Sequence, residues 1–231
     1  MDPKQLLADE RLNDGCCIYC GNPADTREHA PSKIFLDEPF PSGLSTVPAC
    51  SSCNNGYSKD EAYLACFMEC VITGTTDYSS FKRQKIAKHL KRSPKLKNAI
   101  SESSFTDSDG NLVWRPDIKR VNNVLKKLAV GHSKYELSYP FEGNADISTH
   151  PFILMTNEQR SEFEDMPCCS LWPEINSRAF LRILGKLPNS LSCENGWVIV
   201  QDGQYRYQVV EPNLVKIVIS EYLGCMVEFI E

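Results

Sequence analysis

Hydrophobic and polar positions divide the chain into segments with different patterns. Residues 16–53 carry only short apolar runs among Pro, Gly, Ser and Asn, which is typical of a loop-rich module without its own large core. Residues 62–72 are apolar on nearly every side, so the pattern predicts a buried helix, and Ser58 with Glu61 has the spacing of a capping box at its start. Residues 1 to about 14 are expected to form a short lead-in helix or a frayed terminus.

Amphipathic periods predict two further helices. Residues 81–92 place Phe81, Ile86, Ala87 and Leu90 on one stripe, and Ser93-Pro94 ends this helix. Ser108-Asp109-Gly110-Asn111 predicts a hairpin turn between two short strands. Asp117 is placed to cap the next helix, whose expected inner face comprises Ile118, Val121, Val124, Leu125 and Leu128.

The last third of the chain has the pattern of strands. A capping box is predicted at residues 156–159. Residues 197–200 and 205–210 flank the turn dipeptide Asp202-Gly203, and the apolar runs 215–219 and 226–230 follow. These segments predict an antiparallel sheet of three or four strands, so the fold class is α+β.

Composition indicates an ordinary protein with a packed core. The 231 residues suit one large domain or two small ones, and 42% of them are hydrophobic. The longest apolar stretch is interrupted by Glu69 and is too short to span a bilayer, so no membrane partner and a cytoplasmic location are expected. In a reducing compartment, eleven cysteines favour metal ligation and core packing over disulfides.

Charge is unevenly distributed. The net charge of −5 argues against non-specific coating of nucleic acid, yet residues 81–100 contain eight basic residues and no acidic one. Such a stretch can neutralise several phosphates; a solvated helix face is the alternative. The candidate nucleic-acid-binding residues are Lys82, Arg83, Lys85, Lys88, Lys91 and Arg92.

Four cysteines form two Cys-x-x-Cys pairs, namely Cys17 with Cys20 and Cys50 with Cys53. Two such knuckles can close one tetrahedral thiolate site, so the spacing predicts a structural Zn²⁺. Four unrelated core thiols are the alternative. Cys16 could replace Cys17, but only Cys17 keeps the two-residue spacing.

The remaining cysteines and histidines have less specific spacing. Cys66 and Cys70 lie one helical turn apart in an apolar run, which favours core packing. No ligand spacing is visible at Cys168, Cys169, Cys193 or Cys225. The histidines His89, His132 and His150 are expected to be a basic-face residue, a helix-end residue and a surface residue, respectively.

Three polar residues lie between and after the knuckles: Glu28, His29 and Asn54. Carboxylate and amide oxygens are hard ligands that suit Mg²⁺ or Mn²⁺ and leave positions for water and a phosphate oxygen. A histidine with an ordinary pKa of about 6.5 accepts a proton from water at neutral pH. Together they are a minimal set for phosphodiester hydrolysis; a loop histidine that caps the knuckle is the alternative for His29.

With these residues, the segment 16–65 resembles the zinc-stapled HNH endonucleases, which have a ββα-metal fold. The resemblance lies in the runs Cys17-x-x-Cys20-Gly21, Arg27-Glu28-His29-Ala30-Pro31 and Val47-Pro48-Ala49-Cys50-x-x-Cys53-Asn54-Asn55. In that family the residue before the histidine and the polar residue after the last cysteine hold the catalytic metal, and the histidine is the general base. The resemblance implies these roles for Glu28, Asn54 and His29.

The chain departs from the family pattern at two positions. Glu28 stands where Asp or His is more common, and Ser45 stands where Asn is common, five positions before the third cysteine. Ser45 could still orient the His29 loop by hydrogen bonding. Asn55 competes with Asn54 for the metal, because spacing alone does not fix the register of a loop.

The resemblance implies an HNH nuclease module at residues 1–75, followed at 76–231 by an α+β domain of unknown role. The expected activity is metal-dependent endonucleolytic hydrolysis, with structural Zn²⁺, catalytic Mg²⁺ or Mn²⁺, and DNA as the expected nucleic acid partner. The alternative function is a non-catalytic zinc module that binds nucleic acid or a protein partner. The C-terminal sheet could also recruit a protein partner, as in an effector subunit of a defence system.

Overall fold

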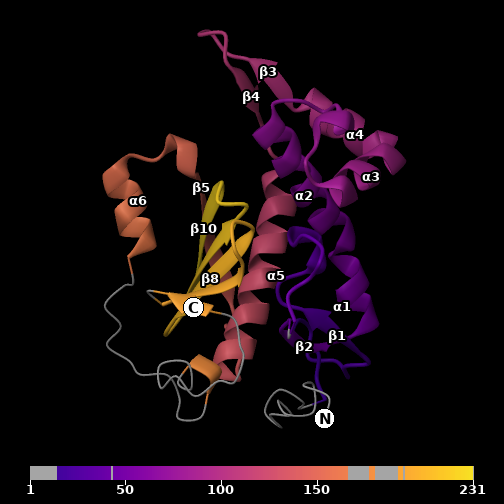
Figure 1. Ribbon diagram of the computed structural model, residues 1–231. Helices are drawn as coiled ribbons and strands as arrows, with labels where there is room; N and C mark the ends of the chain where they lie inside the picture. Colours follow the sequence, from indigo (N-terminus) through magenta and orange to yellow (C-terminus); the bar gives the residue numbers. More distant parts are fainter. Residues whose placement is uncertain (1–14, 43, 166–176, 180–191, 195, 231) are drawn as a thin grey trace. The chain divides into compact units, whose positions relative to one another are not determined.

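The computed structural model describes residues 15–42, 44–165, 177–179, 192–194 and 196–230 (Figure 1). Its helices and sheets confirm the α+β class. The chain forms two compact units: unit 1 comprises Met1–Gly56 with Leu125–Glu231, and unit 2 comprises Tyr57–Val124. These bounds differ from the functional division at residue 75, which stays a prediction. The expected lead-in helix at 1–14 lies outside the described residues.

Unit 1 begins with a short strand–strand–helix arrangement. Strand β1 (Thr26–His29) pairs antiparallel with β2 (Thr46–Ala49), and helix α1 (Ser51–Gly56) follows directly. The 3-10 helix η2 (Lys33–Phe35) lies in the connection between the strands. Side chains along β1 alternate in burial, since Arg27 is exposed and Glu28 is buried.

The rest of unit 1 is built on a six-stranded antiparallel sheet with the order β5-β10-β9-β8-β7-β6. Its strands are β5 (Asn144–Pro151), β6 (Ser192–Glu194), β7 (Trp197–Gln201), β8 (Tyr205–Val210), β9 (Leu214–Ile219) and β10 (Leu223–Ile230). The C-terminal antiparallel sheet is confirmed, but the predicted number of strands is wrong. Strand β5 was missed because its sequence is largely polar, and β6 because it has three residues.

Helix α5 (Ile118–Leu137) enters unit 1 at Leu125 and is buried on both sides there. Tyr135 packs with Val47 of β2, while Glu136 accepts a 2.6 Å hydrogen bond from the Tyr207 hydroxyl of β8. A Cβ on Gly131 would lie 3.2 Å from the Cβ of Ala30, so glycine lets the helix approach the residue that follows His29. Figure 1 shows the helix running beside the sheet.

The prediction of His132 as a helix-end residue is wrong. The residue lies inside α5 and is completely buried, with its ring stacked 3.7 Å from that of Tyr207. Its Nε2 lies 2.8 Å from the Tyr205 hydroxyl oxygen. Burial, together with the positive charge of Lys127, lowers the pKa of His132 to about 3, so the imidazole is neutral at physiological pH.

The opposite face of the sheet is covered by an aromatic cluster. The 3-10 helix η4 (Phe152–Leu154) and helix α6 (Asn157–Glu164) supply Phe152 and Phe163, which pack with Trp197 and Val218. A Cβ on Gly224 would lie 2.6 Å from the Phe152 ring, so this contact requires glycine. The capping box at residues 156–159 is confirmed.

Unit 2 consists of helices and one hairpin. Helix α2 (Ser58–Thr73) buries residues 61–70, as predicted, but the predicted capping box is wrong. The residue preceding the helix is Tyr57, which has a helical backbone and no side-chain cap, because α1 ends immediately upstream. The predicted hairpin is confirmed by strands β3 (Ser104–Thr106) and β4 (Leu112–Trp114), and Asp117 accepts a hydrogen bond from the Arg120 amide at the start of α5.

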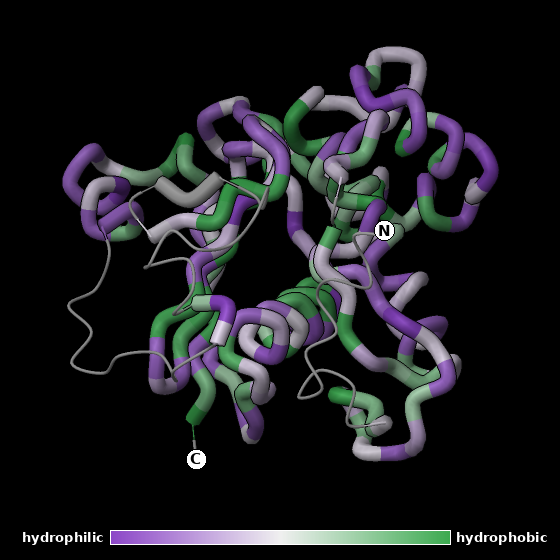
Figure 2. Tube along the Cα trace, turned by 60° about the horizontal axis from the view of Figure 1, so that its bottom comes forward, coloured by the Kyte–Doolittle hydropathy of each residue, from purple (hydrophilic) through white to green (hydrophobic). Residues whose placement is uncertain are grey.

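The basic region of unit 2 forms helices α3 (Gln84–Arg92) and α4 (Pro94–Glu102), preceded by the 3-10 helix η3 (Tyr78–Ser80). The predicted inner stripe is confirmed, since Phe81, Ile86, Ala87 and Leu90 are all buried. The hydropathy colouring of Figure 2 shows long hydrophobic runs in the strands of the sheet and many hydrophilic positions in α3. No helix in the described part of the chain is both long and apolar enough to cross a membrane.

Candidate metal centre and active site

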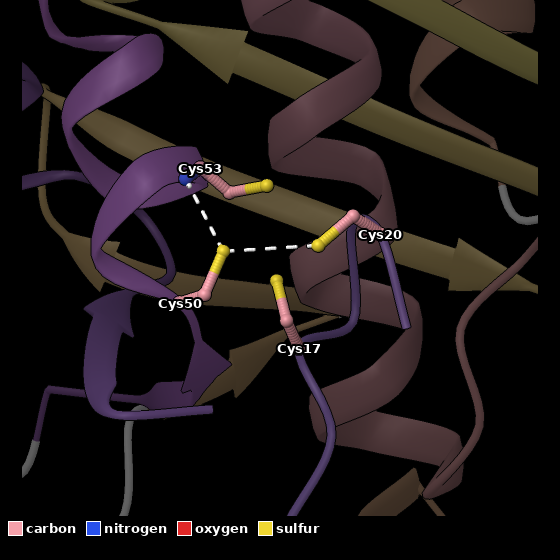
Figure 3. A group of neighbouring side chains, drawn as sticks. All are labelled: Cys17, Cys20, Cys50 and Cys53. Carbon is pink, nitrogen blue, oxygen red and sulfur yellow. Dashed lines mark hydrogen bonds between the residues drawn. The ribbon is translucent and has the colours of Figure 1, made fainter. Parts of the chain in front are cut away.

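The four predicted zinc ligands converge on one point. Cys17 and Cys20 precede β1, Cys50 and Cys53 flank the start of α1, and their sulfur atoms all lie within 4.8 Å of one another (Figure 3). The Cys20 and Cys50 sulfurs are 3.7 Å apart. Zinc–sulfur bonds of about 2.3 Å give a tetrahedron with edges of about 3.8 Å, so the group can hold a metal such as zinc. Cys16 is exposed and outside the group.

Local backbone geometry holds the two knuckles. The Gly21 amide donates to the Cys17 carbonyl at 2.8 Å, with Gly21 at a φ of 73° that glycine adopts without strain. The Cys53 amide donates to the Cys50 sulfur at 3.4 Å (Figure 3). The Asp25 carboxylate accepts from both the amide and the hydroxyl of Ser51, which fixes the start of α1.

The thiols respond unequally to their surroundings. Burial raises the pKa of Cys17, but hydrogen bonds from the backbone of Cys50, Tyr19 and Cys20 outweigh it and bring that pKa to about 7. Burial and the three neighbouring thiols raise the pKa of Cys53. One thiolate therefore forms readily, whereas further thiolates in the same small volume require a cation.

Glu28 is engaged by a residue that the sequence did not reveal. Its Oε1 accepts a 2.8 Å hydrogen bond from the Lys127 ammonium of α5 and a 3.3 Å bond from the Ser32 hydroxyl. The same ammonium donates to the Ser32 hydroxyl at 2.7 Å. Lys127 lies 99 residues further along the chain, so no local motif could have indicated it.

Asn54 faces the strand that carries Glu28 and His29. Its Nδ2 donates to the Thr26 hydroxyl at 3.2 Å, and that hydroxyl donates to the Ala49 carbonyl at 2.8 Å. The Asn54 oxygen is therefore directed away from Thr26. Asn55 is exposed and donates to the Ser51 carbonyl of its own helix, so Asn54 is the one of the two that contacts β1.

His29 ends β1, half-buried and opposite Thr46. Arg27 projects from the same face, because side chains two apart share a face of a strand, and its Nε donates to the Thr46 hydroxyl at 3.0 Å. A guanidinium thus lies over the cross-strand partner of His29. The same alternation directs Glu28 to the other face of β1.

Ser45 makes a hydrogen bond to the His29 loop, and it does so through its main chain rather than its hydroxyl. Its main-chain oxygen accepts a 2.9 Å hydrogen bond from the Ala30 amide, which holds the residue after His29. The Ser45 Oγ is buried and has no hydrogen-bond partner in the part of the chain that the structure describes. The main chain of Ser45, directly before β2, therefore holds the loop, and its side chain does not.

Glu28 and Asn54 carry a carboxylate and an amide oxygen, which are the ligand types that a hard divalent ion prefers. Within the described residues, Glu28 Oε2 accepts no hydrogen bond, and the Asn54 amide is oriented with its nitrogen on Thr26. The other oxygen of the Glu28 carboxylate, Oε1, is paired with the Lys127 ammonium.

The predicted nucleic-acid-binding residues lie in unit 2. On and next to α3, the exposed members are Lys82, Lys85, Lys88, Lys91 and Arg92. Arg83 is half-buried, and the Lys91 ammonium lies 6.0 Å from the centre of the Tyr78 ring.

Cys66 and Cys70 are buried in α2, and burial raises the pKa of each thiol to about 12, which fits core packing rather than ligation.

The structure describes no side chain for three further cysteines, so the prediction that they are not metal ligands is not tested there. Cys168 and Cys169 lie outside the described residues, and Cys193 is described only as part of β6.

Comparisons with protein-family models, with curated proteins and with solved structures find no match for this chain. The resemblance to HNH endonucleases therefore rests on the motif residues quoted above.

Proposed function

We propose that this protein is an HNH-type endonuclease that hydrolyses phosphodiester bonds, with DNA as the preferred substrate. The observation that carries the proposal is the position of His29 at the end of β1, in a strand–strand–helix arrangement next to a four-cysteine group. Glu28 belongs to the same strand. Asn54 of α1 contacts this strand through the Thr26 hydroxyl. A reducing cytoplasm would keep the four thiols available for zinc.

Each residue has a chemical role in the proposed reaction. The His29 imidazole accepts a proton from the attacking water. The exposed Arg27 guanidinium, held by Thr46, binds a non-bridging phosphate oxygen. A Mg²⁺ or Mn²⁺ ion held by Glu28 and Asn54 would supply the charge that stabilises the leaving oxygen.

The deciding experiment incubates purified protein with plasmid DNA under varied divalent ions and compares His29→Ala with the parent. Cleavage should fall by about 10²-fold or more, because a positioned general base contributes about 10²–10⁴. Zinc content and DNA binding should be unchanged, since His29 is not among the sulfur ligands. His89→Ala, on the exposed face of α3, is the matched control and should cleave at the parental rate. Parental cleavage by His29→Ala would refute the proposal.

One observation favours a second candidate, a non-catalytic zinc module that binds nucleic acid or a protein partner. The buried pair of Glu28 and Lys127 is an arrangement that a structural scaffold also uses. Zinc-loaded protein that binds DNA or RNA but cleaves neither, with any of several divalent ions, would support this candidate and exclude the nuclease.

A further inference from the structure

We propose that Lys127 is a built-in counter-ion of Glu28, so that the active site takes up its divalent ion together with a substrate phosphate rather than beforehand. This inference rests on the proposed function, and it adds the order in which ion and substrate bind. It comes from the juxtaposition of one carboxylate, one ammonium and one hydroxyl beneath the candidate site.

The first step is burial. The side chain of Lys127 is 1% exposed and that of Glu28 is 9% exposed. A carboxylate removed from water to this extent is costly without a cation beside it. Lys127 supplies that cation at 2.8 Å, and Ser32 bridges the two groups. The site is therefore preformed in the absence of any divalent ion.

The second step is the rigidity of the ammonium's support. Lys127 lies one helical turn before Gly131, where α5 approaches Ala30 so closely that an added Cβ would be 3.2 Å from its neighbour. Withdrawal of the ammonium would break its hydrogen bonds to Glu28 and to the Ser32 hydroxyl. A divalent ion at the open Glu28 oxygen therefore joins Lys127 instead of replacing it.

The third step is the charge that an arriving ion meets. Glu28 contributes −1 and Lys127 contributes +1, which sum to zero, and Asn54 is neutral. A hard divalent ion gains little by entering a site without net negative charge. A bound phosphodiester adds one negative charge and one oxygen ligand. Ion and nucleic acid therefore strengthen each other's binding, and the coupling is reciprocal.

The test measures Mn²⁺ binding by electron paramagnetic resonance in zinc-loaded His29→Ala protein, which retains Glu28, Asn54 and Lys127 and should cleave at least about 10²-fold more slowly. Titrations are run without DNA and with a short DNA duplex. Mn²⁺ should bind at least about tenfold more tightly when the duplex is present, in line with typical coupling between two sites. Equal Mn²⁺ affinity with and without DNA would overturn the inference.

A charge-removing variant sharpens the test. Lys127→Met in the His29→Ala background keeps the side-chain length and removes the charge, so Mn²⁺ should bind at least about tenfold more tightly without DNA. Lys126→Met is the matched control, because the Lys126 ammonium donates to the Gly143 carbonyl and should leave Mn²⁺ affinity unchanged. Unchanged affinity in Lys127→Met would also overturn the inference. If that variant does not fold, the DNA dependence in His29→Ala alone decides.

The outcome separates this inference from the proposed function. DNA-dependent Mn²⁺ binding in a protein whose parent cleaves no nucleic acid would sustain the counter-ion and refute the nuclease. Cleavage that requires His29 would support the nuclease. If Mn²⁺ affinity in that case changes neither with DNA nor in Lys127→Met, the counter-ion inference is refuted.

Discussion

The four-cysteine group and the Glu28–Lys127 pair are two ionisable clusters in the same compact unit, and they differ in what they need to be stable. The cysteines gather four acidic groups with no cation among them, so a metal such as zinc can complete the site. The pair contains its own cation. Four thiolates in the cysteine group therefore require a bound cation, whereas the Glu28–Lys127 pair needs none.

The two clusters also differ in how the chain assembles them. Each knuckle is a short motif, and the two halves are joined by the pairing of β1 with β2. The ion pair instead joins β1 to a helix 99 residues away. Local spacing encodes the first cluster, and only the packing of α5 against the β1–β2 pair creates the second.

The largest effect is expected from breaking the first cluster. Cys53→Ser removes one of four zinc ligands, and zinc binding supplies about 10–16 kcal/mol of folding free energy in small zinc modules. The variant should lose its zinc, and the β1–β2–α1 region should become sensitive to protease. Metal analysis and limited proteolysis measure both effects.

Cys16→Ser is the control for this experiment, because Cys16 adjoins the first knuckle but is exposed and outside the group. It should keep one zinc per chain and the parental protease pattern. Soluble, folded parent without zinc would contradict the interpretation of the group, and so would a Cys53→Ser variant that unfolds like the parent.

A smaller effect is expected from breaking the second cluster. Glu28→Gln leaves the Lys127 ammonium buried without a counter-charge, which costs about 3–5 kcal/mol in comparable pairs. The double variant Glu28→Gln with Lys127→Met removes both charges and should recover most of that loss. Chemical denaturation of zinc-loaded protein measures the free energy of unfolding. Additive losses in the double variant would show that the two residues are not coupled.

Sequence reasoning predicted best where the information is local. The knuckles, the inner stripe at Phe81, Ile86 and Leu90, and the β3–β4 hairpin each depend on residues a few positions apart, and the structure confirms them. Sequence reasoning failed where a side chain contacts residues that are distant in the sequence. His132 looked like a polar helix end, but in a distant strand Tyr205 pairs with its Nε2 and Tyr207 stacks on its ring.

In the sheet and in the candidate site, sequence reasoning also missed features that depend on contacts between distant residues. Strand β5 has little apolar alternation because it lies at the edge of the sheet, where only β10 pairs with it. Ser45 was expected to orient the His29 loop by hydrogen bonding, but the sequence could not indicate that its main-chain oxygen would accept from the Ala30 amide. For Glu28, sequence could indicate a polar residue next to a histidine, but not that a buried lysine would neutralise it.

The smallest structural effect is expected in unit 2, where the basic residues of α3 are proposed to bind the DNA. Changing Lys85, Lys88 and Arg92 together to Gln should leave the fold intact, because all three are exposed on α3. If each contacts a phosphate, DNA binding should weaken for all sequences alike.

The plot of log affinity against log salt concentration should then flatten by about three units, since each contact displaces about one counterion. A control triple variant at Lys59, Arg115 and Lys119 removes the same charge from exposed positions elsewhere in unit 2. Equal losses in both triple variants would mean that only net charge matters. An unchanged affinity and slope in the α3 variant would make its basic residues a solvated helix face and leave capture of the DNA to residues such as Arg27 beside the candidate active site.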